Sequence, residues 1–478
     1  MASSARIGEP QNATPPENQS EGWATRLIQR LLGIDRDRLL KKLVPWVSKG
    51  GLAILDQGLI SGSNFLTSVL LARWMMPEQY GAYAIAFGVY VLLQVVYQSQ
   101  VLEPMTVFAG SAYRKCLRGY LGSVLWVHTT VSLGILTVFG VGALGAMRLS
   151  HNAGLAGALA GVTFATPWIL GAAMARRSFY LQLAPAQAAL GAFIYSTTSV
   201  AGLYVLRHYA LLSPFTAFTL MGVSALATGV FQFMRLRRDL PKSDLKAPGP
   251  RETWKRHWKY GRWALASSVA GWIPAYIYYP LLSSFGNIAH SGQLKALMNL
   301  TLPMEQTKAA LGLLLLPYAA RVHGEEGHAS AKKLSVRMTM ISTGGALIYW
   351  LVILPFQRPV FHLLYSNRYM DVVHLLPVIA FGSIVWSAAY GPAIALRSME
   401  SPKSVFTAFS LATATSLLVG VPATWKFGLQ GAIWGGNLAD MLSLTFVVIV
   451  LRKKIASGNQ VVAWNARSGR LAKELPAE

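Results

Sequence analysis

Five charged side chains interrupt stretches of the sequence that are otherwise apolar. They are Asp56, Glu103, Glu305, Lys308 and Asp440. A charge at membrane depth is costly, so such a residue is by default a candidate for function. It can bind a charged substrate, carry a coupling ion or hold helices together through an ion pair. The chemistry to look for is therefore recognition of charge inside a helical bundle.

Glu305 and Lys308 are three residues apart, so on a helix they share one face and can pair directly. In a functional interpretation, Lys308 binds an anionic pyrophosphate, because its ammonium is a compact cation suited to phosphate. Glu305 then orients Lys308 or carries a coupling proton. In a structural interpretation, the two residues form a buried ion pair that holds helices together. The sequence leaves both interpretations open.

Asp56, Gln57 and Asn64 give the first apolar stretch a polar stripe. This stripe either lines a cavity or forms hydrogen bonds between helices. Asp440, close to Asn437, either faces the same cavity or pairs with a neighbouring helix. We predict that Asp56, Gln57, Asn64 and Asp440 are cavity or substrate-binding residues, together with the Glu305 and Lys308 pair.

Two residues are candidates for a gate or for ion coupling. Glu103 precedes Pro104, whose missing N–H frees a backbone carbonyl in the turn before it. Arg73 is at the outer end of the first apolar stretch, where it is either an anchor or a gate residue.

Polar and aromatic side chains are candidate sugar-facing surfaces. They are Gln94, Gln98 and Gln100 in the second apolar stretch and Trp272, Tyr276, Tyr278 and Tyr279 in the seventh. Aromatic rings stack on sugar faces, but Trp and Tyr near helix ends also form the interfacial belt of membrane proteins. We favour the belt for Tyr278 and Tyr279.

The elements that must position these residues are about twelve apolar stretches, each near the roughly 20 residues that a helix needs to cross a bilayer. We place these helices at residues 50–72, 81–103, 119–147, 153–175, 186–206, 211–234, 262–285, 296–320, 338–357, 372–396, 404–424 and 428–451.

Positive charge is sorted along the chain in a way that supports this count. With a cytoplasmic N-terminus, 35 of the 43 Lys and Arg fall in cytoplasmic segments, seven, including Lys295, fall in outside segments, and Lys308 falls within a helix. A miscounted helix would invert every later loop and destroy this asymmetry, which follows the positive-inside rule. The sequence predicts an all-α polytopic membrane protein of about twelve transmembrane helices with both termini cytoplasmic.

The predicted helices fall into two six-helix halves, residues 48–234 and 262–451, joined by a basic cytoplasmic linker at 235–261. Two halves joined by a long linker suggest a duplicated transporter with its substrate site between them.

Three terminal segments flank these halves. Residues 1–22 are polar and predict a disordered tail. Residues 23–47 have the pattern of a basic amphipathic helix on the membrane surface. Residues 452–478 are predicted to be a cytoplasmic tail.

The composition excludes several classes of function. The net charge of +24 fits cytoplasmic loops that face anionic lipids, and no compact basic domain is present to bind nucleic acid. The single cysteine, Cys116, excludes an intramolecular disulfide and a cysteine-rich metal site. The sequence contains no Walker loop, no nucleophile elbow and no HExxH zinc helix. We therefore expect no enzyme activity, no metal and no cofactor.

Five short stretches carry a resemblance to a known family. They are residues 56–58 (DQG), 70–73 (LLAR), 77–83 (PEQYGAY), 363–369 (LLYSNRY) and 428–432 (GLQGA). They resemble the multidrug/oligosaccharidyl-lipid/polysaccharide exporter superfamily, in particular its polysaccharide (Wzx-like) flippase branch, for which the Pro-Glu-x-Tyr-Gly pattern in a short outside loop is typical. The resemblance covers residues 53–451.

The resemblance implies a transporter of the bacterial cytoplasmic (inner) membrane. It would flip a lipid-linked oligosaccharide, a polyprenyl-pyrophosphate repeat unit, by alternating access for polysaccharide or lipopolysaccharide biosynthesis. The implied partners are this substrate, membrane lipids and other polysaccharide-assembly proteins. Flippases of the family have a cationic cavity that meets the pyrophosphate, and the superfamily works mostly as monomers.

Two alternatives stay open. A cation-coupled multidrug exporter of the same superfamily would use an acidic interior, which Asp56, Glu103 and Asp440 would supply, whereas the Pro-Glu-x-Tyr-Gly loop favours the flippase. A membrane-bound glycan-assembly enzyme would need a large outside loop, and the predicted outside loops are short.

Overall fold

The computed structural model describes residues 36–149, 153–240, 247–326, 328–399 and 402–471. The chain divides into two units, residues 1–48 and 49–478. Of the first unit only the start of α2 (Arg36–Trp74) is described. The predicted tail and the predicted amphipathic helix up to residue 35 lie outside the described residues. All contacts reported below lie within the second unit.

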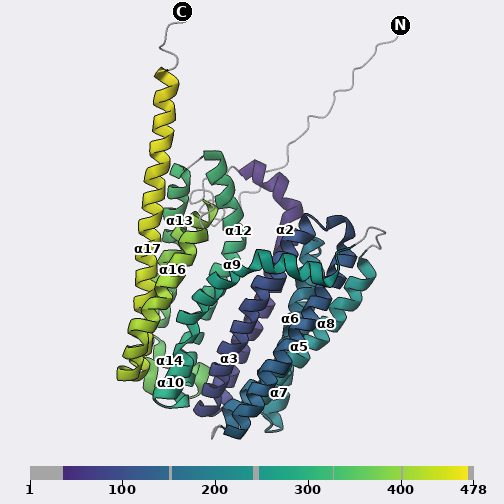
Figure 1. Cartoon of the computed structure of the whole chain (residues 1–478). Coiled ribbons are helices and arrows are strands. Elements are labelled where there is room, and N and C mark those ends of the chain that lie inside the picture. The colour runs from purple at the N-terminus through teal and green to yellow at the C-terminus, as the bar shows by residue number, and fades with distance from the viewer. Residues whose placement is uncertain (1–35, 150–152, 241–246, 327, 400–401, 472–478) are drawn as a thin grey trace, which may run out of the picture. The chain divides into compact units, whose positions relative to one another are not determined.

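In the described residues, all regular secondary structure is helical (Figure 1). We divide the helices into a first set, α2 to α8, and a second set, α9 to α17. The first set comprises α2 (Arg36–Trp74), α3 (Pro77–Tyr97), α4 (Glu103–Gly110), α5 (Leu117–Leu149), α6 (Ala153–Leu181), α7 (Pro185–His208) and α8 (Pro214–Asp239). The second set comprises α9 (Pro250–Tyr276), α10 (Tyr278–Phe285), α11 (Ile288–Asn299), α12 (Leu302–Glu326), α13 (His328–Ile353), α14 (Gln357–Tyr365), α15 (Leu376–Ser398), α16 (Pro402–Thr415) and α17 (Val421–Leu471).

Every predicted transmembrane range overlaps helix. Within the described residues, eight helices are long and apolar enough to cross a membrane by length and composition. The last of them, Lys403–Ala456, covers two predicted ranges, and Gly428 has a non-helical backbone (φ 56°, ψ −130°) where these ranges meet. The chain is thus a multi-pass helical membrane protein, and the count of twelve stays a prediction.

The predicted linker at 235–261 is largely helical. α8 continues to Asp239 and α9 begins at Pro250, where a proline suits the first turn because its missing N–H would have no helical partner there. Thr253, His257 and Gly261 of α9 are buried at a four-residue spacing, and the residues between them are exposed. The second part of the linker is therefore an amphipathic helix.

Pro104 explains an irregular turn in the predicted second helix. A π-helical turn, η1 (Gln98–Leu102), separates α3 from α4. Because Pro104 has no N–H, the carbonyl of Gln100 lacks its helical donor, and it accepts a hydrogen bond from His257 Nδ1 at 3.2 Å. A Cβ atom on Gly261 would lie 2.4 Å from Ser99 O, so α9 approaches this turn very closely. The proline helps to fix where the linker helix binds.

The predicted eighth helix consists of two helices, α11 and α12, separated by a turn at Leu300 and Thr301. Pro303 has no N–H for the carbonyl of Asn299, so α11 cannot continue without interruption. α11 starts at Ile288, ahead of the predicted start at residue 296. A broken helix of this kind brings backbone and polar side chains into the bundle interior.

The two helix sets contact each other through α3 and α11. A Cβ atom on Gly81 would lie 1.9 Å from Ile288 O, and one on Gly292 would lie 2.8 Å from Pro77 O. Glycine is needed at both positions because the two backbones touch.

Tyr278 and Tyr279 correct a prediction. Both are 4% exposed and lie in the hydrophobic core, with the Tyr278 hydroxyl packed against the backbone of Gly420 and Gly435. The prediction that they belong to the interfacial belt is wrong, because residues near the end of a span can equally face neighbouring helices.

Candidate functional site

Asp56 of α2 is fully buried and is bound by two side chains of α6. Arg176 Nε donates to both carboxylate oxygens, at 3.0 and 2.8 Å, and Arg176 Nη2 lies 2.6 Å from Oδ2. Tyr180 Oη also donates to Oδ2. A carboxylate removed from water requires such partners, so this ion pair joins α2 to α6.

Gln57 extends this cluster to the second helix set. Arg176 Nη2 donates to Gln57 Oε1 at 3.1 Å, and Gln57 Nε2 donates to Gln306 Oε1 of α12 at 3.4 Å. Ser61 Oγ donates to the same Gln306 oxygen at 2.8 Å. Asn64 is exposed and forms none of these bonds. The structure therefore brings Asp56 and Gln57 together, and Asn64 as a cavity residue stays a prediction.

Glu305 and Lys308 of α12 pair as their spacing predicts, with Lys308 Nζ 2.7 Å from Glu305 Oε1. The Lys308 side chain is 8% exposed and that of Glu305 is 37% exposed. Lys308 Nζ also lies 3.4 Å from Ser387 Oγ and near the ring of Trp386 on α15. Asp440 of α17 interacts electrostatically with both members of the pair. Three charges from α12 and α17 thus form one group.

Lys295 is a buried cation that the charge count had placed in an outside loop. It lies within α11, is 6% exposed, and its Nζ is 4.0 Å from the centroid of the Phe87 ring on α3. Among the residues that the structure describes, no carboxylate is within ion-pair distance of Lys295. The ring face recovers part of the cost of removing the ammonium from water. The prediction of a loop residue is wrong because α11 begins earlier than the apolar stretch does.

The two gate candidates lie in different surroundings. Glu103, the first residue of α4, is exposed and interacts electrostatically with the half-buried Arg177 of α6. Arg73 Nη1 donates to Leu363 O on α14 at 2.9 Å, so it links the two helix sets. A gating or coupling role for either residue stays a prediction.

Asn299, at the turn between α11 and α12, is fully buried among three hydroxyl groups. Its Oδ1 accepts a hydrogen bond from Ser68 Oγ at 2.8 Å. Its Nδ2 donates to Tyr80 Oη at 3.0 Å and lies 3.4 Å from Tyr365 Oη. Ser68 and Tyr80 belong to the first helix set and Tyr365 to the second, so this network ties the two sets together.

Two of the aromatic residues predicted to face a sugar lie in contact with each other. Trp272 and Tyr276 stack with 6.0 Å between ring centroids, and Trp272 Nε1 donates to Gly88 O of α3 at 3.0 Å. Gln100 is buried, and its side-chain amide has no hydrogen-bond partner among the described residues. Contact of these groups with a sugar stays a prediction.

Three cations that the helices bring into the bundle were not predicted as site residues. Arg176 and Arg177 follow the predicted helix 153–175, in a segment predicted to be a cytoplasmic loop, but α6 continues to Leu181. Lys295 lies one residue ahead of the predicted eighth helix. One signal was available: a buried acid such as Asp56 requires a basic partner from another helix.

Besides Arg73, the charged residues described above are four acids and four bases. The acids are Asp56, Glu103, Glu305 and Asp440, and the bases are Arg176, Arg177, Lys295 and Lys308. Ion pairs engage Asp56 and Glu305. These ion pairs also engage Arg176 and Lys308, so acids and bases balance. Among the described residues, Lys295 is the buried cation that is left without an ion pair and that an anionic ligand could meet. The described residues contain no cluster of three or more His, Cys, Asp or Glu that could hold a metal ion.

No family model and no curated protein matches the sequence. Solved structures do share its fold. An inward-facing multidrug resistance MATE family transporter of the MOP superfamily has 12% sequence identity and a TM-score of 0.72, with 85% of this chain and 99% of the transporter covered. The lipid II flippase MurJ in an inward closed conformation has 12% identity and a TM-score of 0.64, covering 90% and 94% of the two chains.

A third structure is a MOP superfamily transporter from Pyrococcus furiosus, reported with a binding pocket of reverse polarity. It has 12% identity and a TM-score of 0.61, with 86% of this chain and 96% of its own length covered. The chain therefore has the fold of MOP superfamily transporters, which include drug transporters and a lipid flippase. These structural neighbours are transporters and not enzymes.

Proposed function

We propose that this protein flips a lipid-linked oligosaccharide, a polyprenyl-pyrophosphate repeat unit, from the cytoplasmic to the outer leaflet of a bacterial cytoplasmic membrane. The observation that carries the proposal is Lys295, a cation that is 6% exposed and has no carboxylate within ion-pair distance among the described residues. Arg176, Arg177 and Lys308 are further cations on helices of both sets, each beside an acid. The pyrophosphate of a lipid-linked sugar is esterified at both phosphates and is a dianion. It must leave water during the crossing, and cations inside the bundle reduce that cost.

The physical task is to move a polar head across about 30 Å of hydrocarbon. In our proposal the sugar and pyrophosphate pass between the helix sets while the lipid tail stays in the bilayer. Lys308 is the first candidate to bind the pyrophosphate, because Glu305 and Ser387 hold its ammonium in place at 2.7 and 3.4 Å. Lys295 is the second, since no carboxylate among the described residues neutralises it.

Alternating access would require the contacts between the helix sets to open in turn. The Asn299 network and the Arg73 contact with Leu363 O would open at the outer end of the predicted topology. The Gln57 contact with Gln306 is a separate contact between the helix sets, and it would open in a different step. The sequence contains no nucleotide-binding motif, so an ion gradient or the flux of substrate would supply the energy.

A cation-coupled multidrug exporter is the second candidate. Asp440 favours it, because this carboxylate has no ion-pair partner within 4 Å among the described residues and could bind a cation. The fold shared with a MATE family transporter is compatible with it. Asp56 favours it less than the sequence suggested, because Arg176 already neutralises that carboxylate.

Depletion of the protein in the cells that produce it tests the proposal. The flippase predicts that lipid-linked oligosaccharide accumulates on the cytoplasmic leaflet. The wild type should reverse the accumulation, whereas Lys308→Ala and Glu305→Ala should not, at equal expression. If no lipid-linked sugar accumulates and the sensitivity to cationic dyes changes instead, the exporter is correct and the flippase is not.

A further inference from the structure

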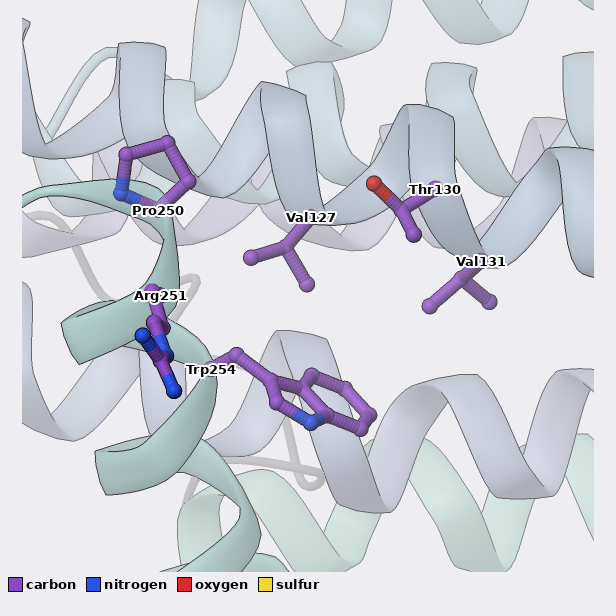
Figure 2. A pocket seen from close by; sticks show the side chains of 6 residues that line it. All are labelled: Val127, Thr130, Val131, Pro250, Arg251 and Trp254. Carbon is purple, nitrogen blue, oxygen red and sulfur yellow. The ribbon is translucent and has the colours of Figure 1, made fainter.

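A cavity of about 280 Å³ lies between α5 and the start of α9, away from the charged residues described above (Figure 2). Its lining residues are Val127, Thr130, Val131, Pro250, Arg251 and Trp254. In Figure 2 the indole of Trp254 reaches from α9 toward the face of α5 that carries the two valines. The lining is mostly apolar, with a single charge at Arg251. This combination suits a molecule with an apolar chain and an anionic end.

The cavity is a fixed part of the fold, because the segment before α9 is bound to α5. Ser123 Oγ donates to Pro248 O at 2.5 Å. A Cβ atom on Gly119 would lie 2.5 Å from the Cβ of Ala247, so this segment packs tightly on α5. Pro250, the first residue of α9, and Val127 of α5 both line the cavity. Both walls of the cavity are therefore held in place.

Arg251 is available for an anion. It is exposed, and among the described residues no carboxylate lies within ion-pair distance of it. The neighbouring acid, Glu252, pairs with Arg256 at 3.0 Å. Gly249, the residue before the helix, has no side chain to cap the N–H groups of Arg251 and Glu252, which are the first in α9 because Pro250 has none. A helix N-terminus with free N–H groups favours an anion, so Arg251 and the backbone act in the same direction.

The exposed face of α9 has the composition of a helix at the membrane surface. Lys255 and Lys259 alternate with Trp254, Trp258 and Trp263, which are 38%, 47% and 73% exposed. Tryptophan rings and basic side chains on one helix are typical of the headgroup region. The mouth of the cavity at Arg251 would therefore lie at the level of lipid phosphates.

We propose that this cavity binds one anionic phospholipid of the cytoplasmic leaflet. Its phosphate would contact Arg251 and the first N–H groups of α9, and one acyl chain would lie along Val127 and Val131 under the Trp254 indole. The proposal uses the cytoplasmic orientation predicted for the 235–261 linker. It does not depend on which substrate the protein transports.

Photolabelling in proteoliposomes tests this site. The probes are phosphatidylglycerol and phosphatidylcholine, each with a photoreactive group in one acyl chain, and the labelled peptides are located by mass spectrometry. We expect label on the peptide that contains Val127 and Val131, with phosphatidylglycerol favoured about fivefold, the factor that one cationic contact near an anionic headgroup gives.

Two variants separate the parts of the site. Arg251→Gln should remove the preference for phosphatidylglycerol and keep the labelling, while the matched exposed arginine variant Arg237→Gln should keep both. Thr130→Trp fills the cavity from an exposed position and should reduce the labelling by either lipid. Equal labelling by the two lipids in the wild type would overturn the proposal. It would also be overturned if added polyprenyl phosphate displaced the label and excess phosphatidylglycerol did not, since the cavity would then hold the tail of a polyprenyl lipid.

Discussion

Gln57 Nε2 of α2 lies 3.4 Å from Gln306 Oε1 of α12, and through this contact the Asp56–Arg176 ion pair reaches the residue beside Glu305. The ion pair of the first helix set and that of the second are therefore joined by two neutral amides. A neutral contact can separate without leaving an unpaired charge in the bundle. We infer that the helix sets can part here while each ion pair stays intact.

Arg176→Gln should destabilise the protein more than Asp56→Asn. The first change leaves a fully buried carboxylate without its cation, which costs about 3–5 kcal/mol, whereas Arg176 is 26% exposed and can turn toward solvent when Asp56 is removed. The double variant should recover most of the lost stability. Thermal denaturation of the purified protein in detergent measures all three. Additive losses in the double variant would show that the two residues do not act as a pair.

Lys295→Met should raise the denaturation temperature and abolish transport. A buried cation whose contact among the described residues is an aromatic ring costs more than an apolar side chain of similar length. Its removal should therefore stabilise the fold. If the charge serves the substrate, the more stable variant is inactive. Lys403→Met, at an exposed position, should change neither property. Full activity of Lys295→Met would remove Lys295 from the substrate path.

Lys308→Ala should reduce transport at least tenfold, and Glu305→Gln should reduce it less. Lys308 is the more buried partner and also contacts Ser387, whereas Glu305 is 37% exposed. A loss of one charge-assisted contact to an anion is worth about 1.5–3 kcal/mol, or roughly ten- to a hundredfold. The measurement is the initial rate of transport at matched protein levels. A larger effect of Glu305→Gln would instead place the essential charge on the carboxylate, as an exporter of cations requires.

Asn299→Ala should loosen the contact between the helix sets at the Ser68, Tyr80 and Tyr365 hydroxyls. Loss of its amide removes its hydrogen bonds to these hydroxyls, but Ser68 Oγ and Tyr80 Oη still contact each other at 3.0 Å and Tyr365 Oη still donates to Ala296 O at 2.9 Å. The expected cost is therefore that of lost hydrogen bonds, about 0.5–1.5 kcal/mol each. The single native cysteine makes a direct assay possible: Ala296→Cys in a Cys116→Ser background should react faster with a membrane-impermeant maleimide when Asn299→Ala is added. Gln430→Ala, at an exposed position, is the control and should leave the rate unchanged. If Asn299→Ala left the rate of the maleimide reaction unchanged, this network would not hold the two helix sets together.

His257 should make the stability depend on pH. Burial lowers the pKa of His257 to about 4, compared with an ordinary value of about 6.5. Gln100 O can only accept, so Nδ1 carries the proton and Nε2 accepts from Tyr120 Oη at 2.8 Å; the folded state holds the neutral ring. The stability that this ring provides is complete above about pH 6.5 and is lost as the pH falls toward 4.

The size of the His257 effect follows from the shift in pKa. It amounts to about 3 kcal/mol between the two limits. Denaturation temperatures of the wild type and of His257→Gln, taken from pH 7.5 to pH 4.5, give the difference that isolates this group. The gap between the two proteins should shrink steadily toward low pH. If the difference in denaturation temperature between the two proteins stayed constant with pH, the pKa of His257 would not differ between the folded and the unfolded chain.

The sequence predicted the helical architecture because each transmembrane helix requires a long apolar stretch, whatever its neighbours in the bundle are. Gly428 is an example: its non-helical backbone lies where the predicted ranges 404–424 and 428–451 meet. The start of α11 was missed. Polar residues of α11 such as Ser291 and Lys295 are buried against other helices, so they end the apolar stretch but not the helix.

The candidate site was predicted only in part. The Glu305–Lys308 pair follows from local spacing and is present. The partner of Asp56 lies 120 positions along the chain at Arg176, and no periodicity in one sequence reports such a contact. Arg176 also lies just past an apolar stretch, where a basic residue normally marks a loop. The balance of four acids and four bases could therefore be recognised only in the packed structure.

Reconstitution of the purified protein into proteoliposomes tests the central claim most directly. The measurement is the transfer of a labelled polyprenyl-pyrophosphate oligosaccharide between leaflets, with a cationic dye assayed in parallel. We predict transfer of the lipid-linked sugar by the wild type and by Lys403→Met, loss of transfer in Lys308→Ala, and no movement of the dye. Dye movement that depends on Asp440, without any transfer of the lipid-linked sugar, would contradict the flippase.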